Sequence, residues 1–159
     1  MNELVCYHEA GHVVMAVYLG GRVSSATIEP DRDDGPRLDG GVQVVWTFSR
    51  LCERELMEKC MLVALAGPVA EMIHSGNPYH PGFIEEWKQD WQSGWDAAKL
   101  LARDDRRRLT LMEETTAEIY RLFSKDRLWQ AIAALADELS AHETLDEEQI
   151  VEIVQTWLR

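Results

Sequence analysis

The chain has 159 residues, enough for one domain with a buried core, and its net charge of −12 argues against nucleic acid or an anionic membrane as a partner. A hydrophobic content of 46% argues against disorder, and Cys6, Cys52 and Cys60 lack the spacing of a zinc finger. Because the sequence shows neither a signal peptide nor a long uncharged apolar segment, we expect a soluble, cytoplasmic protein with free thiols.

The first predicted element is a helix over about residues 3–19. Asn2 is a suitable N-cap, and an apolar run without Pro continues to the glycine pair at residues 20–21. On this helix His8 and His12 are four residues apart, so both imidazoles can reach one metal ion. Glu9 lies about 100° around the helix axis, where it can reach a water held by that metal. This pattern is typical of a zinc hydrolase with two His ligands and a Glu general base.

The neighbours of this motif favour a buried metal site over a surface helix with two solvated histidines. They are mostly Val, Met and Cys, among which polar groups are costly to bury unless they have partners. Gly11 adds to the case, because Gly inside a helix costs about 1 kcal/mol relative to Ala. Its presence predicts the close approach of another backbone.

Two strands are expected next, over residues 22–29 and 42–48, as a hairpin joined by a long acidic loop. The rest of the chain has helical patterns and no internal repeat. We therefore predict a mainly α (α+β) fold, with one small β-hairpin or sheet after the first helix and a single domain over residues 1–159.

The later helices are predicted from apolar spacing and capping residues. Ser49 can cap the first of them, in which Pro68 predicts a kink or a break. Thr144 and Glu147 have the spacing of a capping box for the last. The predicted ranges are residues 50–73, 83–103, 111–123, 128–141 and 147–158.

A tryptophan stripe marks the helix predicted over residues 83–103. Trp87, Trp91 and Trp95 are spaced four apart and therefore share one helix face. A stripe of this kind usually packs against a core, and the alternative is the wall of a substrate cleft.

A catalytic zinc ion normally takes a third protein ligand, which must come from later in the chain. Asp90 is preferred, because its helix face continues into the small residues Gly94 and Ala97 and can approach the Gly11 side of the first helix. Asp96 ranks next, and Glu71 third, as a ligand or as a partner that orients an imidazole. For each carboxylate the competing interpretation is a solvated helix residue. The full set of candidates is Glu71, His74, His80, Glu86, Asp90 and Asp96.

Several segments, in order, resemble the peptidase domain of the FtsH family, the AAA-linked zinc metalloproteases. Residues 7–12, Tyr-His-Glu-Ala-Gly-His, are similar to that family's His-Glu-Ala-Gly-His helix. Residues 23–30 and 40–42 resemble its strand pair, and residues 65–71 resemble its Ala-Gly-Arg-x-Ala-Glu segment. Residues 142–146 resemble the Glu-Thr-Leu turn before its last helix.

The resemblance implies a mainly helical zinc peptidase whose third ligand is an Asp that opens a later helix, a role that Asp90, followed by Trp91, fits best. The chain departs from the family in three places: Pro68 replaces an Arg, the loop over residues 31–39 is longer and more acidic, and the Asn-Asp and Ala-Thr signature of the ligand helix is not intact. No Gly-x-x-x-x-Gly-Lys-Ser/Thr motif occurs, so ATP-driven unfolding is not expected of this chain.

The sequence thus predicts a zinc-dependent metallopeptidase-like hydrolase, with Zn²⁺ held by His8, His12 and Asp90 and with Glu9 as general base. Its expected substrates are peptides or unfolded proteins, and either a homo-oligomer or a separate ATPase partner is compatible with the resemblance. The strand over residues 42–48 either offers an edge to an extended peptide or packs without a free edge. Two alternatives stay open: a non-catalytic metal-binding scaffold or regulatory partner, and an amidase acting on a non-peptide substrate.

Overall fold

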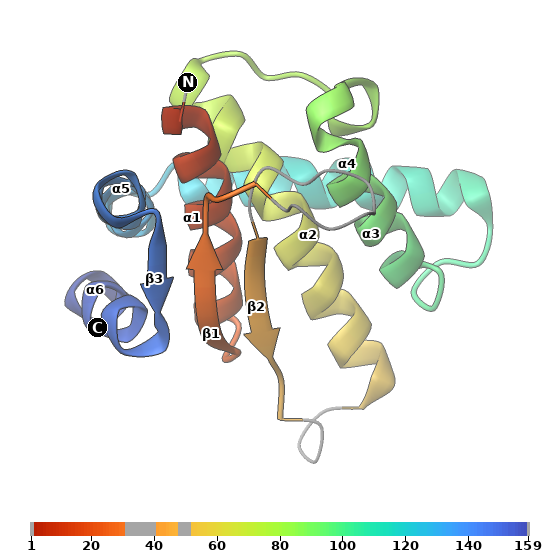
Figure 1. The fold of residues 1–159 in the computed structure, drawn as a ribbon. Coiled ribbons are helices and arrows are strands. Elements are labelled where there is room, and N and C mark those ends of the chain that lie inside the picture. Colours follow the sequence, from red (N-terminus) through yellow and green to blue (C-terminus); the bar gives the residue numbers. More distant parts are fainter. Residues whose placement is uncertain (1, 31–40, 48–51, 159) are drawn as a thin grey trace.

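The computed structural model of the protein describes residues 2–30, 41–47 and 52–158 and confirms a mainly helical α+β fold (Figure 1). Two short 3₁₀ helices, η2 (Pro81–Phe83) and η3 (Glu85–Trp87), precede the third α-helix. None of the helices in these ranges has the length and apolar character needed to cross a membrane. The α-helices are α1 (Asn2–Tyr18), α2 (Glu53–Ser75), α3 (Lys88–Ala98), α4 (Asp105–Phe123), α5 (Asp126–His142) and α6 (Glu147–Leu158).

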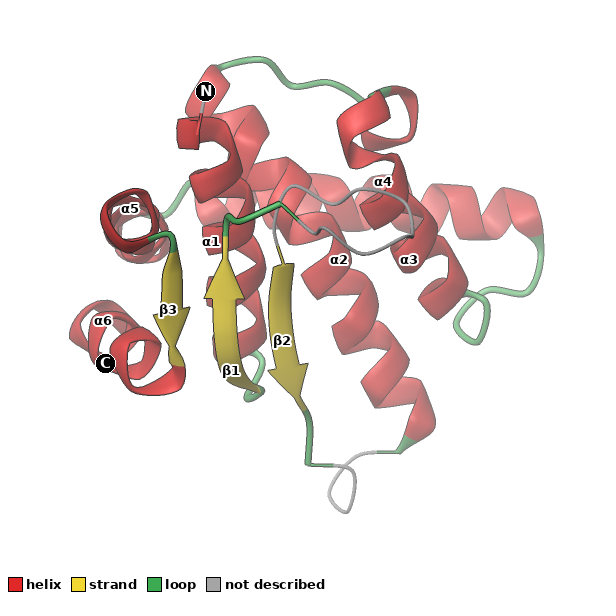
Figure 2. Ribbon diagram, viewed as in Figure 1, coloured by secondary structure: helices red, strands yellow, loops and turns green. Residues whose placement is uncertain are grey.

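The sheet has three antiparallel strands, β1 (Arg22–Thr27), β2 (Gly41–Val45) and β3 (Thr144–Asp146), in the order β2-β1-β3 (Figure 2). The predicted pairing of the first two strands is confirmed. Both strands end earlier than predicted, β1 at Thr27 and β2 at Val45, and residue 48 lies outside the described ranges. The sequence did not predict β3, because a three-residue strand between two helices has no alternating pattern of its own. Within the described residues β2 hydrogen-bonds to β1 alone, so it is an outer strand.

Helix α1 lies at the centre of the molecule, in contact with α2, α5 and the sheet (Figure 1). The side chains of Ala10, Val13, Val14 and Ala16 are all fully buried, so the helix is covered on several faces. Helix α2 approaches it closely at Gly11, where an added Cβ would lie 2.6 Å from the carbonyl oxygen of Ala66. The predicted close backbone approach at Gly11 is therefore present, and its partner is α2.

The α3 helix does not pack on Gly11 as the sequence led us to expect. Gly94 instead faces Met112 of α4 and Leu65 of α2. The predicted helix over residues 83–103 is also too long, because the two 3₁₀ helices precede α3, which starts at Lys88 and ends at Ala98.

Helix α2 runs without interruption through Pro68, so the break offered as one outcome is wrong. The residues on both sides of Pro68 are buried, and this packing outweighs the roughly 3 kcal/mol that an internal Pro costs. The predicted cap, Ser49, lies outside the described residues. The observed N-cap is Cys52, whose sulfur accepts a hydrogen bond from the backbone N–H of Glu55 at 3.5 Å.

The last helix has the predicted bounds but a different cap. Thr144 belongs to β3, so it cannot cap α6 as predicted. Asp146 and Gln149 form the reciprocal pair instead: each side chain accepts a hydrogen bond from the other residue's backbone N–H at 2.9 Å. Helix α4 starts at Asp105, earlier than predicted, because Asp104 caps it through the backbone N–H of Arg107.

Candidate metal centre

His8 and His12 lie on one face of α1, one turn apart, as the sequence predicts. Their Nε2 atoms face each other at 3.2 Å, and the rings meet nearly edge-on, with an interplanar angle of 80°. His12 is buried and His8 is half-buried. The pair is therefore a converging arrangement in the protein interior and not a pair of solvated surface rings.

The opposite nitrogen of each ring contacts an acceptor on α2. His12 Nδ1 lies 2.6 Å from the backbone carbonyl oxygen of Val63, and His8 Nδ1 lies 3.2 Å from Oε2 of Glu71. A carbonyl oxygen only accepts hydrogen bonds, so Nδ1 of His12 must be the donor. A carboxylate also only accepts, so Nδ1 of His8 is the donor to an ionised Glu71. In the neutral ring this leaves the lone pair on Nε2, the form in which imidazole binds a metal.

Asp90, in the first turn of α3, completes the group. Its Oδ2 lies 2.6 Å from Nε2 of His8 and 3.4 Å from Nε2 of His12. The ligand atoms of all three residues lie within 4.8 Å of one another. This places a carboxylate of the later helix against both imidazoles, and it is the carboxylate preferred from the sequence.

The spacing and chemistry of these donors fit zinc. Ligand atoms bound at about 2.0–2.1 Å in a tetrahedron are spaced by about 3.3–3.4 Å. The distances from His12 Nε2, 3.2 Å to His8 and 3.4 Å to Asp90, agree with that spacing, whereas the contact between His8 and Asp90 has the length of a hydrogen bond. Two imidazoles and one carboxylate are also a usual set of three protein ligands at a catalytic zinc ion.

The electrostatics of the group favour a positive charge between its members. Burial by itself would lower the pKa of His8, but hydrogen bonds to Asp90 and Glu71 outweigh it and raise that pKa to about 10. Burial would also lower the pKa of His12, but the charge and hydrogen bond of Asp90 outweigh it, so the pKa of His12 is raised. The pKa of Asp90 is held below its usual range, because His12 and His8 outweigh the effect of burial on its carboxyl group.

Glu9 follows His8 on α1, and its side chain is buried, with 7% of its surface exposed. Burial raises the pKa of its carboxyl group, and the nearby charges of His12 and His8 oppose that shift. A carboxylate whose pKa lies nearer neutrality is a better general base at that pH. Glu9 is not among the three residues whose ligand atoms converge, as expected from its position around the helix.

Of the remaining candidate ligands, Glu71 contacts the group and the other four have different surroundings. Asp96 is exposed and pairs with Lys99 at 3.1 Å, and Glu86 is also exposed. His74 contacts Glu3 at 3.2 Å, and His80 contacts Glu113 at 3.0 Å. Glu71 touches His8 at Nδ1, the nitrogen that faces away from Asp90, so it has the geometry of an orienting partner.

Three parts of the site were not predicted. The Val63 carbonyl is a backbone group and leaves no signal in the sequence. Gly67 lies against the ring of His12, where an added Cβ would come within 2.6 Å of Cε1. Trp87, expected to be one of a packing stripe, is buried and donates a hydrogen bond from Nε1 to Glu71 Oε2.

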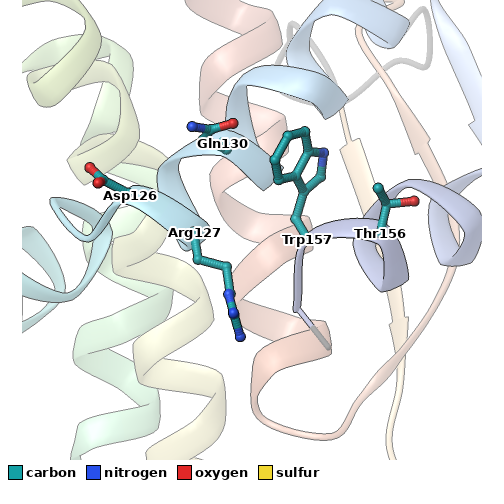
Figure 3. Close-up of a pocket in the computed structure, with 5 residues that line it drawn as sticks. All are labelled: Asp126, Arg127, Gln130, Thr156 and Trp157. Carbon is teal, nitrogen blue, oxygen red and sulfur yellow. The ribbon is translucent and has the colours of Figure 1, made fainter.

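Two surface hollows lie away from this group, between α5 and α6. The one in Figure 3 has a volume of about 340 Å³. A neighbouring hollow of about 500 Å³ shares Thr156 and Trp157 with it. Neither includes a histidine or a cysteine, so neither has the donors of the group formed by His8, His12 and Asp90. The residues that line the first hollow are Asp126, Arg127, Gln130, Thr156 and Trp157.

No protein-family model matches the chain, and no curated protein matches it either.

Proposed function

We propose that the protein is a zinc-dependent metallopeptidase-like hydrolase in which His8, His12 and Asp90 hold the metal and Glu9 is the general base. The observation that carries this proposal is the convergence of two Nε2 atoms and one carboxylate oxygen beside a buried glutamate. Three protein ligands leave a fourth position for water or substrate, whereas structural zinc sites are usually closed by four.

A zinc ion held by these residues would lower the pKa of its water to about 7 and would polarise the substrate carbonyl. The Glu9 carboxylate accepts the proton of the attacking water and delivers it to the leaving amine. Glu71 and the Val63 carbonyl keep the two imidazoles in the orientation and tautomer that point their Nε2 atoms inward. The burial of His12 and Glu9 limits competing contacts with bulk water.

The resemblance to the FtsH peptidase domain supports the same proposal. Of the segments that carry the resemblance, residues 7–12 and 65–71 contain the two imidazoles, Glu9 and Glu71. Asp90 lies in the first turn of a later helix, where the resemblance implies the third ligand. Under this proposal the chain is a peptidase domain of that type. The thiols of Cys6, Cys52 and Cys60 are free, as a reducing compartment such as the cytoplasm would keep them.

The proposed substrate is an extended peptide. In the described part of the sheet, β2 is an outer strand, and an outer strand offers backbone N–H and C=O groups to a segment that adds to the sheet. A peptide or an unfolded protein can adopt the extended backbone that pairs with β2, so no unfolding partner is needed for such substrates.

The test measures zinc content and cleavage of an unstructured peptide library for the unmodified protein, Glu9→Gln and the control Glu3→Gln. Glu3 is an exposed residue on the same helix. We expect one zinc ion per chain in all three and a loss of cleavage of about 100-fold or more in Glu9→Gln alone. If the unmodified protein binds zinc but cleaves no peptide in the library, the peptidase proposal fails and metal binding survives.

A further inference from the structure

We infer that Trp87 is a positioning residue of the metal centre, acting on His8 through Glu71. The inference rests on the proposed zinc site and concerns how that site is held in shape. It assigns a role to an indole N–H that the ligands themselves do not touch.

Glu71 connects the two residues through a single oxygen. Its Oε2 accepts hydrogen bonds from Nε1 of Trp87 and, at 3.2 Å, from Nδ1 of His8. The Trp87 ring is 6% exposed, so its N–H is largely shielded from water. The only polar atom of this buried side chain is thus directed at the carboxylate that orients a proposed ligand.

The position of Trp87 in the chain gives this contact a second consequence. Trp87 ends η3, and Asp90 follows three residues later in α3. One short segment therefore controls both nitrogens of His8: Asp90 contacts Nε2 at 2.6 Å, and Trp87 reaches Nδ1 through Glu71. The hydrogen bond from Trp87 to Glu71 fixes this segment to α2 and so holds Asp90 in position beside the His8 ring.

The other members of the tryptophan stripe make different contacts. The Trp91 ring lies 4.9 Å from the ring of His80, and the Trp95 ring lies 4.8 Å from the guanidinium of Arg108. The stripe thus contains one residue joined to the metal centre and two that pack elsewhere. Trp95 is therefore a control of the same residue type, eight residues further along the chain.

Removing the indole N–H should free Glu71 to turn away from His8. The imidazole would then lose its fixed orientation, and the ligand set would have to be ordered by the metal itself. Outer partners of this kind typically contribute 10- to 100-fold to metal affinity.

The test compares Trp87→Phe with Trp95→Phe, each measured for zinc affinity by competition with a chelator and for thermal stability. We expect zinc binding about tenfold weaker in Trp87→Phe and within about twofold of the unmodified protein in Trp95→Phe. In a Glu71→Ala background, adding Trp87→Phe should change the affinity by less than about twofold, because the connection is already absent. An equal loss in both backgrounds, or none in either, would overturn the inference.

A measurement on the unsubstituted ring covers the case in which Trp87→Phe fails to fold. With ¹⁵N-labelled tryptophan, zinc should shift the indole N–H resonance of Trp87 and leave that of Trp157 in place. A Trp87 resonance that stays unshifted while zinc is bound would overturn the inference and leave the metal site intact. Failure of the unmodified protein to bind zinc would overturn both.

Discussion

Gly67 of α2 lies against the imidazole ring of His12, so close that a Cβ at this position would come within 2.6 Å of Cε1. Four residues earlier on the same helix, the Val63 carbonyl oxygen lies 2.6 Å from Nδ1 of His12. Successive turns of α2 therefore hold the ring at its edge and at one nitrogen. The orientation of this proposed ligand depends on a residue that has no side chain.

Replacing Gly67 with Ala should weaken zinc binding by about tenfold or more, because the ring must move away from its position among the ligands. Helix propensity alone would make Gly67→Ala more stable, since Ala favours a helix over Gly by about 1 kcal/mol. Zinc affinity and thermal stability should be measured together. Gly94→Ala is the control, because its Cβ would meet the flexible end of Met112 at 3.0 Å. Unchanged zinc affinity in Gly67→Ala would contradict this prediction.

The identity of the third ligand can be tested with two Asp→Asn variants on α3. An asparagine in place of Asp90 would keep the shape of the side chain but lose the charge that faces both histidines, so Asp90→Asn should weaken zinc binding by more than about 100-fold, beyond the range of outer partners. Asp96→Asn should leave the affinity unchanged, since Asp96 is exposed and pairs with Lys99. Equal effects of the two variants in a chelator competition would reject Asp90 as the ligand.

The sequence was informative where chemistry follows helical spacing. The four-residue separation of His8 and His12 predicted their shared face, and Gly11 predicted a close helix approach. The preference for Asp90 selected a carboxylate that contacts both rings, but its stated reason, an approach to Gly11, was wrong. Spacing identifies a helix face without identifying the helix that covers it.

The remaining contacts could not be read from the sequence, because they join segments far apart in the chain. Val63 meets His12 through a backbone oxygen that every residue type possesses. Trp87 has the spacing of a packing residue, and only its burial beside Glu71 distinguishes it from Trp91. The strand β3 is three residues long and exists because β1 offers it an edge.

The packing of α1 on α2 predicts a large effect of Gly11→Ala on stability. The added Cβ would lie 2.6 Å from the Ala66 carbonyl oxygen and 2.7 Å from the Cβ of Ala70, which are parts of a helix that cannot move as a flexible side chain can. Overpacking of this kind typically costs about 1–3 kcal/mol. Urea unfolding of the metal-free protein would measure it. A Gly11→Ala variant as stable as the unmodified protein would show that the helices separate at little cost.

The capping pair of α6 gives a prediction that separates the observed cap from the one expected from the sequence. Asp146→Ala removes the carboxylate that accepts the Gln149 backbone N–H at 2.9 Å, so it should lower the free energy of unfolding by about 1 kcal/mol. Thr144→Ala should cost less, because the Thr144 hydroxyl bonds the hydroxyl of Thr27 in an exposed part of the sheet and does not cap the helix. Urea unfolding of the two variants, with Gln149→Ala as the reciprocal partner, provides the comparison. A larger loss in Thr144→Ala than in Asp146→Ala would contradict the assignment of Asp146 as the cap, since the residue that satisfies the first free N–H groups of α6 should show the greater effect.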